Sequence, residues 1–162
     1  MQQKLTDEKV VFQKLSAICA RAEHCQHDML EKMRQWGVDQ EVQARVMERL
    51  LKERYINDER FARAFVHDKV KYNQWGRRKV EQALWLKHID EHVARTALDE
   101  IEENDYLSVL RPMLKQKRKS LLSGKTLSDY ELNVKLMKWA MGRGFTMDVI
   151  KQCINIDADD EY

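Results

Sequence analysis

Apolar residues recur along most of the chain at the spacing of amphipathic helices. The segment from about Asn57 to Asn73 illustrates the pattern, because its apolar positions form one stripe of a helix: Phe61, Ala62, Phe65, Val66 and Val70. Asn57 suits the N-cap of that helix, since its side chain can accept a hydrogen bond from the first turn. One proline and five glycines in 162 residues rarely interrupt such stretches. The pattern therefore predicts an all-helical (all-α) protein.

This helical pattern occurs three times along the chain. Turns align at residues 36–39, 87–90 and 143–146, which are 51 and 56 residues apart. Apolar positions downstream of the turns also align, the first set being Val42, Val93 and Val149. A period of this length with helical spacing indicates stacked helical units. We predict three tandem three-helix repeats, each similar to a helix-turn-helix, which together form an elongated, curved body.

The predicted boundaries are 1–54 for the first repeat, 55–102 for the second, 103–156 for the third and 157–162 for an acidic tail. Asp90 should cap the third helix of the second repeat. In the third repeat, the Ser128-x-x-Glu131 pattern predicts a capping box at the start of a helix. Gly37 should end a helix in a left-handed conformation. Pro112 lies within the opening helix of the third repeat, where it should kink or break the helix.

Composition narrows the class of protein without identifying its partner. The net charge of +2, from 29 basic and 27 acidic residues, does not by itself indicate nucleic-acid binding. The acidic tail leaves the rest of the chain more basic, which suits an acidic partner. We expect no membrane span, because no apolar run approaches the roughly 20 residues needed, and no secretory signal opens the chain. Three cysteines, an odd number, indicate reduced thiols and a cytoplasmic protein.

The second predicted repeat carries a family resemblance. Residues 55–66, YINDERFARAFV, resemble the signature of the RecX family, an aromatic-Ile/Leu-Asx-Asp-x-Arg-Phe-Ala segment. Residues 75–80, WGRRKV, are similar to the glycine-basic segment that opens the next helix in that family. Residues 84–89 resemble its Leu-x-x-Lys-Gly-Ile turn, with His88 in place of the glycine. The layout of three-helix repeats fits the family along the whole chain, and the motifs are specific between about residues 55 and 101.

The resemblance implies a regulatory function. RecX-like proteins bind the RecA recombinase, lodge in the groove of the RecA–DNA filament and suppress its ATPase and strand-exchange activities. They thereby limit filament growth in DNA repair, recombination and the SOS response. They do no chemistry themselves, so the resemblance implies a protein that is not an enzyme and needs no cofactor. We expect a monomer.

The residues most specific to the family signature are Tyr55, Asp58, Arg60, Phe61 and Gly76. We interpret them as structural, because a motif inside an amphipathic helix usually maintains packing. Asp58 favours the start of its helix, and Phe61 belongs in the core. Arg60 is expected to pair with a carboxylate of the same repeat.

Basic and aromatic residues flank the predicted turn at Gly76, and we call this set the Gly76 surface: Lys69, Lys71, Trp75, Arg77, Arg78 and Lys79. One interpretation is a solvated face, as charge runs usually are. The other is a surface that contacts RecA or the DNA phosphate backbone, with Trp75 as a stacking or wedge residue. The sequence leaves both open.

A second basic run in the third repeat comprises Lys115, Lys117, Arg118 and Lys119. An exposed helix end explains this run better than a partner contact, because cations suit the C-terminus of a helix.

Neither a metal site nor a catalytic site is predicted. Cys25-x-His27, with Cys19, His24 and Asp28 nearby, matches no closed zinc pattern. The segment 123–126, SGKT, resembles only the tail of a phosphate-binding loop. Two alternatives to a RecA regulator remain, a helix-turn-helix-like DNA-binding protein and a generic helical adaptor.

Overall fold

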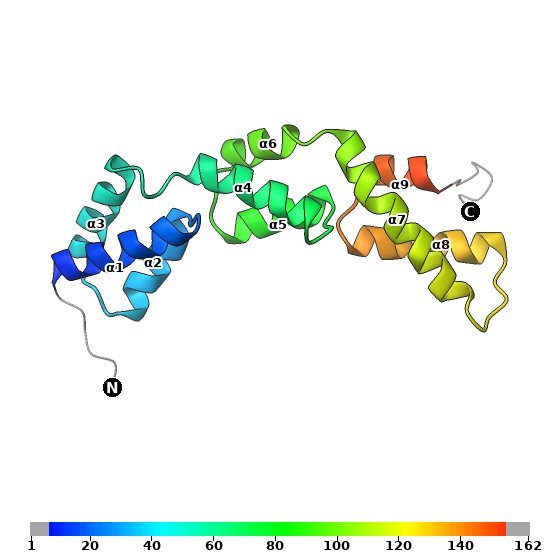
Figure 1. Cartoon of the computed structure of the whole chain (residues 1–162), viewed down its shortest axis with the longest axis horizontal. Helices are drawn as coiled ribbons and strands as arrows, with labels where there is room; N and C mark the ends of the chain where they lie inside the picture. The colour runs from blue at the N-terminus through cyan, green and yellow to red at the C-terminus, as the bar shows by residue number, and fades with distance from the viewer. Residues whose placement is uncertain (1–6, 155–162) are drawn as a thin grey trace. The chain divides into compact units, whose positions relative to one another are not determined.

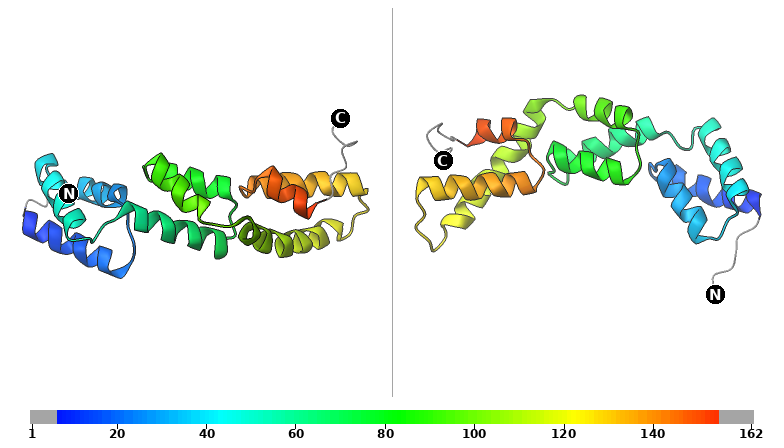
Figure 2. Two further views of the ribbon diagram at one scale, coloured as in Figure 1. Left: turned by 90° about the horizontal axis from the view of Figure 1, so that it is seen from above. Right: turned by 180° about the vertical axis from the view of Figure 1, so that it is seen from behind.

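The computed structural model describes residues 7–154, so the predicted acidic tail at 157–162 lies outside the described residues. Within this range the protein has nine α-helices and no strand, which confirms the predicted all-helical class (Figure 1). Turns and short loops join successive helices (Figure 2). None of the described helices is long and apolar enough to span a membrane.

The helices run, in chain order, as α1 Glu8–Arg21, α2 Gln26–Gln35, α3 Gln40–Lys52, α4 Asp58–Lys71, α5 Arg77–Leu86, α6 Glu91–Asp99, α7 Glu103–Leu122, α8 Asp129–Gly142 and α9 Met147–Cys153. Their contacts group into two compact units. Of the described residues, the first unit comprises 7–65 and 84–94, and the second comprises 66–83 and 95–154. Helices α4, α5 and α6 therefore each contribute residues to both units.

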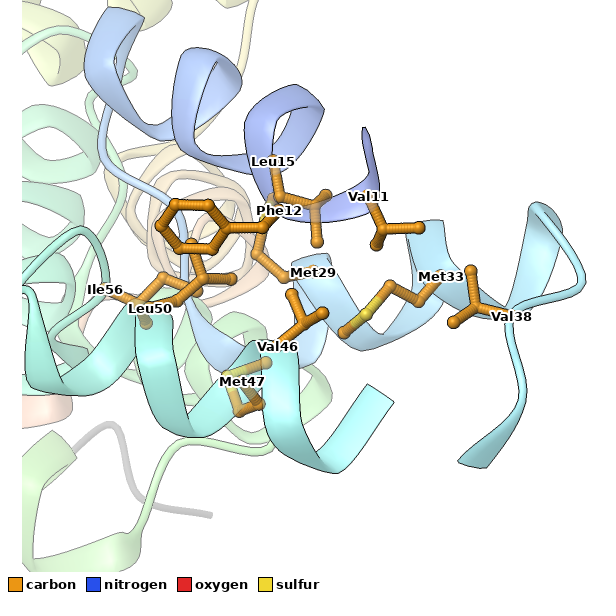
Figure 3. Packing of buried hydrophobic residues seen from close by; sticks show 10 residues of the cluster. All are labelled: Val11, Phe12, Leu15, Met29, Met33, Val38, Val46, Met47, Leu50 and Ile56. Atoms are coloured by element: carbon orange, nitrogen blue, oxygen red, sulfur yellow. The ribbon is translucent and has the colours of Figure 1, made fainter. Parts of the chain in front are cut away.

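The N-terminal part of the first unit has its own apolar core, which α1, α2 and α3 supply (Figure 3). Leu15, Met29, Met33 and Leu50 are completely buried there. Each such side chain contributes about 1.5–3 kcal/mol by its removal from water. At the edge of this core, the ring of Phe12 meets that of Tyr55 edge to face at 5.9 Å. The apolar pattern of the sequence thus becomes the packed face of three helices.

In the second unit, α7 packs against both α8 and α9. Helix α7 buries Tyr106, Leu107, Leu110 and Leu114, where Leu110 follows the first two by four and three residues and precedes Leu114 by four, so the set shares one face. Of the two expectations for Pro112, a kink or a break, the break is wrong, because α7 continues through Pro112 as one helix of 20 residues. Pro112 is exposed, so its ring lies on the solvent side of the helix and away from this packed face.

Several predicted caps and turns are confirmed. The Asn57 side chain accepts a hydrogen bond from the Arg60 amide at 3.0 Å, and that of Asp90 accepts from the His92 amide at 3.1 Å. Ser128 accepts from the Glu131 amide at 3.2 Å, which is the Ser128 half of the predicted capping box. Gly37 has φ +70°, in the left-handed region. Side chains within a few residues of a helix start therefore position the turns as the sequence indicated.

Candidate interaction site

The turn before α5 is held by a close approach of two backbone segments. The Gly76 amide donates a hydrogen bond to the Arg143 carbonyl, and the Arg78 amide donates to the Gly144 carbonyl, both at 2.9 Å. A Cβ atom on Gly76 would lie 2.2 Å from the Phe145 nitrogen, which is closer than any real contact. The first residues of α5 are therefore docked directly onto the turn between α8 and α9.

Gly144, on the other side of this contact, also has no room for a side chain. Its φ is +94°, and a Cβ there would lie 2.5 Å from the Cβ of Lys79. Glycine is the residue that adopts this backbone conformation without steric cost. Two glycines 68 positions apart in the sequence thus allow one backbone contact, and that contact orients the basic residues at the start of α5.

Within the Gly76 surface, Trp75 is half-buried and two lysines approach its ring. The Nζ atoms of Lys69 and Lys79 lie 5.0 and 4.6 Å from the centre of its ring. The Trp75 amide also donates to the Lys69 carbonyl at 3.0 Å. A cation at this distance is attracted to the indole face. Trp75 therefore attracts the side chains of two lysines at the surface.

The remaining members of the Gly76 surface differ in whether a carboxylate of the protein pairs with their charge. Arg77 forms an ion pair with Asp99 at 2.6 Å, so its charge is largely satisfied within the protein. Arg78 is exposed and has no ion pair with any described residue. Lys71 is also exposed, and its Nζ lies 5.7 Å from the ring centre of Tyr72. Lys71 and Arg78 are thus the members best placed to meet a partner.

Sequence reasoning missed Arg143 as part of this region. Its guanidinium donates to the Asn73 carbonyl at 3.3 Å and lies 5.5 Å from the ring centre of Trp139. The Nζ of Lys117 approaches the same ring at 5.7 Å. The position of Arg143 in the third aligned turn was the available signal. No local pattern indicates that this turn contacts the segment before α5, because the contact depends on tertiary packing.

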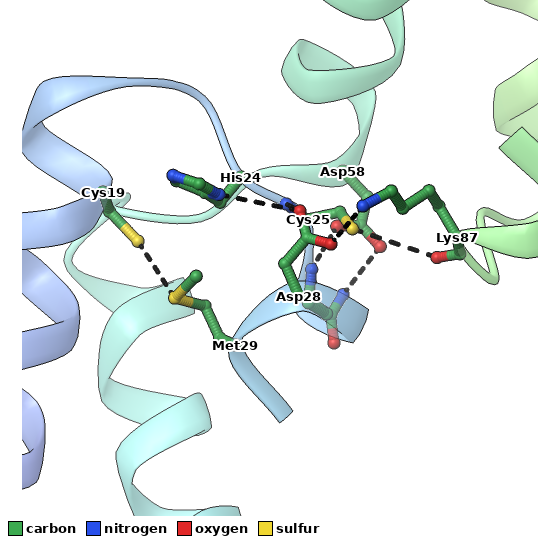
Figure 4. A network of polar contacts seen from close by, with 8 residues as sticks. Cys19, His24, Cys25, Asp28, Met29, Asp58 and Lys87 are labelled. Atoms are coloured by element: carbon green, nitrogen blue, oxygen red, sulfur yellow. Dashed lines mark hydrogen bonds and ion pairs between the residues drawn. The ribbon is translucent and has the colours of Figure 1, made fainter. Parts of the chain in front are cut away.

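The signature residues make contacts between distant parts of the first unit. Asp58 accepts hydrogen bonds from the backbone and side-chain nitrogens of Gln26, at 3.0 and 3.3 Å, and so caps the start of α2 (Figure 4). Burial raises the pKa of Asp58. Phe61 is buried, and its ring centre lies 5.5 Å from that of Phe65. These contacts support the interpretation that Asp58 and Phe61 maintain the fold.

Arg60 also holds chain segments together. Its guanidinium donates to the carbonyls of Arg54 and Tyr55, at 3.2 and 3.3 Å, and forms an ion pair with Glu23. Glu23 precedes α2 and lies in the segment predicted as the first repeat. The expectation of a carboxylate from the same repeat was therefore wrong, because the packing of α4 beside the α1–α2 loop brings a distant carboxylate closer.

A polar network around Asp28 reinforces the start of α2 (Figure 4). Its carboxylate accepts from the Lys87 Nζ at 2.6 Å and from the Cys25 amide at 3.4 Å. Burial alone would raise the pKa of Asp28, but the hydrogen bond and charge of Lys87 lower it. Burial also raises the pKa of the Cys25 thiol to about 11. That thiol therefore stays protonated near neutral pH, which suits a structural cysteine better than a nucleophile or metal ligand.

The candidate metal ligands do not converge. Cys25 is buried at the N-cap of α2, whereas the Cys19 thiol contacts the Met29 sulfur at 3.6 Å (Figure 4). The His27 ring stacks on that of His88 at 4.2 Å between centres. Among residues 7–154, no group of three or more histidine, cysteine, aspartate or glutamate side chains could hold a metal ion.

Two models of one family match the chain. The model described as the second three-helix domain of RecX matches residues 57–98, and the model of the third three-helix domain of RecX matches residues 104–154. Together they cover more than half of the chain.

Relatives with the name regulatory protein RecX match most of the chain. The protein of Clostridium perfringens is 24% identical over 83% of this chain, and the match spans 62% of that relative's length. The protein of Acinetobacter baylyi is 28% identical, over 86% of this chain and 82% of its own. That of Vibrio campbellii is 24% identical, over 96% of this chain and 94% of its own.

Solved structures share the fold. A crystal structure of regulatory protein RecX superposes with a TM-score of 0.82 and 14% identity, over 90% of this chain and 72% of that one. A crystal structure of RecX from Lactobacillus salivarius gives a TM-score of 0.80 and 16% identity, over 91% of this chain and 94% of that one.

Proposed function

Because the chain belongs to the RecX family, we propose that it binds RecA, or the RecA–DNA filament, and regulates it. The regulation is mostly inhibition of the ATPase and strand-exchange activities, and through it of DNA repair and recombination. The relatives are regulatory proteins by name, which supports the general role. In this role the chain acts by binding and catalyses no reaction.

The observation that best supports this proposal is the construction of the Gly76 surface. Lys69 and Lys79 are held on Trp75, while Lys71 and Arg78 extend from the surface without an ion pair to a described carboxylate. Positive charge held outward in this way favours contact with an acidic protein face or with phosphates. We assign the contact with RecA or with filament DNA to this surface.

The test is the DNA-dependent ATPase rate of the cognate RecA on single-stranded DNA, with this protein titrated in below stoichiometry. We expect the rate to fall at far less than one molecule per recombinase, because one regulator bound to a filament blocks many subunits. An unchanged rate, with folded protein verified in the same sample, overturns the proposal. Sequence-specific DNA binding without recombinase would instead favour the helix-turn-helix-like alternative.

A paired set of variants tests the surface itself. Reversing Lys71 and Arg78 to Glu should raise the concentration for half-inhibition about tenfold or more, because each reversal changes an interaction by on the order of 1 kcal/mol. Arg77 stays unchanged, since Glu at that position would repel Asp99 and destabilise the fold. The control reverses two exposed lysines of α8, Lys135 and Lys138. Equal inhibition by both variants would remove the Gly76 surface from the proposal.

A further inference from the structure

A groove of about 830 Å³ lies between α7, α8 and α9, apart from the Gly76 surface. We call it the α7–α9 groove. Three cations of α7 line one wall, at spacings of four and three residues: Arg111, Lys115 and Arg118. Tyr130 and Asn133 of α8 also line the groove. Since residues three and four apart share a helix face, the three cations form a row along the groove.

The charge of this segment is unusual for the chain. Between Asp105 and Asp129 the sequence holds six basic and no acidic residues, although the whole chain has a net charge of only +2. Arg111, Lys115 and Arg118 are exposed, and none forms an ion pair with a described carboxylate. Like charges at these spacings destabilise a helix. The C-terminus of α7 favours a cation near Arg118, but it does not offset the charges of Arg111 and Lys115 farther up the helix. An anionic ligand would relieve the repulsion along the whole row.

The row has the dimensions of a short run of phosphates. Arg111 and Arg118 are seven residues apart, which is about 10 Å along a helix axis. A row of this length can meet about two or three successive phosphates of one nucleic-acid strand. Asp129 adds one carboxylate to the groove, and the three cations outnumber it.

Tyr130 indicates which polyanion fits. Its side chain is 50% exposed and lines the same groove, so part of its ring is open to a ligand. Unpaired bases stack on such rings, whereas a duplex hides its base faces and an acidic peptide has none. We propose that the α7–α9 groove binds single-stranded nucleic acid, with the α7 cations on its phosphates and Tyr130 on a base. This site goes beyond the regulation of RecA, because it requires no recombinase.

The experiment measures binding of the full chain to a fluorescein-labelled oligothymidylate by anisotropy, over a series of salt concentrations. The groove variant replaces Arg111, Lys115 and Arg118 with Gln, which keeps helix propensity and removes the like-charge repulsion. Loss of three phosphate contacts should reduce the slope of log K against log salt by ~2 and the affinity at ~0.1 M salt by ~100-fold. Circular dichroism should show a thermal melt at least as high as that of the wild type.

The matched control removes three exposed lysines of the same repeat that do not line the groove: K135Q, K138Q and K151Q. It has the same net charge as the groove variant and should retain most of the wild-type affinity. A second variant, Y130L, should bind about tenfold more weakly with an unchanged salt slope, since it removes stacking and no charge.

Three results would overturn the proposal. The first is equal weakening by the groove and control variants, and the second is equally tight binding of a duplex of the same sequence. The third is displacement of the oligonucleotide by poly-glutamate at the same concentration as by unlabelled oligothymidylate, which would indicate a site for acidic peptides. The RecA ATPase titration, run in parallel, reports separately on regulation, so failure of one proposal is distinguishable from failure of the other.

Discussion

Gly76→Ala tests the backbone contact that positions the Gly76 surface. The added Cβ would lie 2.2 Å from the Phe145 nitrogen and 2.3 Å from the Gly144 carbonyl carbon, so the obstruction is backbone on both counts. The two segments must separate by about 1 Å to reach ordinary contact distance. Such a separation strains the two hydrogen bonds that join them, from the Gly76 and Arg78 amides.

The expected cost follows from these contacts. Two backbone hydrogen bonds contribute about 1 kcal/mol each, and forced displacement of packed backbone adds about 1–3 kcal/mol. We expect G76A to lower the free energy of unfolding by about 3 kcal/mol or more, measured by urea denaturation with circular dichroism. The Arg78 amide should also exchange its hydrogen faster, since its acceptor moves away.

Gly142 provides the matched control for the same chemical change. It ends α8, and a Cβ there would meet nothing within 4 Å. G142A should leave stability unchanged or raise it by up to about 1 kcal/mol, because alanine favours a helix more than glycine does. If the free energy of unfolding of G76A lies within about 0.5 kcal/mol of the wild-type value, the close approach at Gly76 does not constrain this fold. Our account of the surface is then wrong.

Three further predictions concern the first unit. Asp28→Asn should lower the free energy of unfolding at pH 7 by about 1 kcal/mol, a modest value because the partner Lys87 is 39% exposed. The pKa of Asp28 is lowered in the folded state, so its carboxylate stabilises the fold above the ordinary carboxyl pKa of 3.8. This stabilisation is lost as the pH falls below that value. Urea melts of the wild type and Asp28→Asn should therefore converge at low pH. His88 has φ +55°, so His88→Gly should be about 1 kcal/mol more stable than His88→Ala by thermal melting, and equal stabilities would show that the turn is unstrained. Arg60→Met should cost about 1–2 kcal/mol by losing an ion pair and two carbonyl contacts; a melt that matches the wild type would contradict the bracing role assigned to Arg60.

Local features of the fold could be predicted because their causes lie within one or two helical turns. Asn57 and Asp90 cap helices three or fewer residues away, and Gly37 ends a helix through its own backbone conformation. The alternative of a break at Pro112 was the exception. A proline within a helical pattern usually ends the helix, yet this one is exposed within a long helix whose opposite face is buried, and that packing outweighs the lost hydrogen bond.

The candidate site was predictable in its composition and not in its contacts. The six members of the Gly76 surface could be named from the sequence, but the contacts that each of them makes could not. Arg77 is neutralised by Asp99, and Lys79 lies over Trp75, whereas Arg78 stays unpaired among the described residues. Each of these outcomes depends on which distant side chain the fold brings within a few ångströms.

The sequence by itself determined the helices, their caps and the repeated pattern that resembles RecX, because periodicity and capping act over neighbouring residues. Tertiary structure alone decided which distant segments meet. It placed Gly76 against Gly144, Asp58 at the start of α2, and the cations of α7 along a groove. These contacts depend on steric fit and on charges brought close by packing, and neither is encoded in the spacing of residues along the chain.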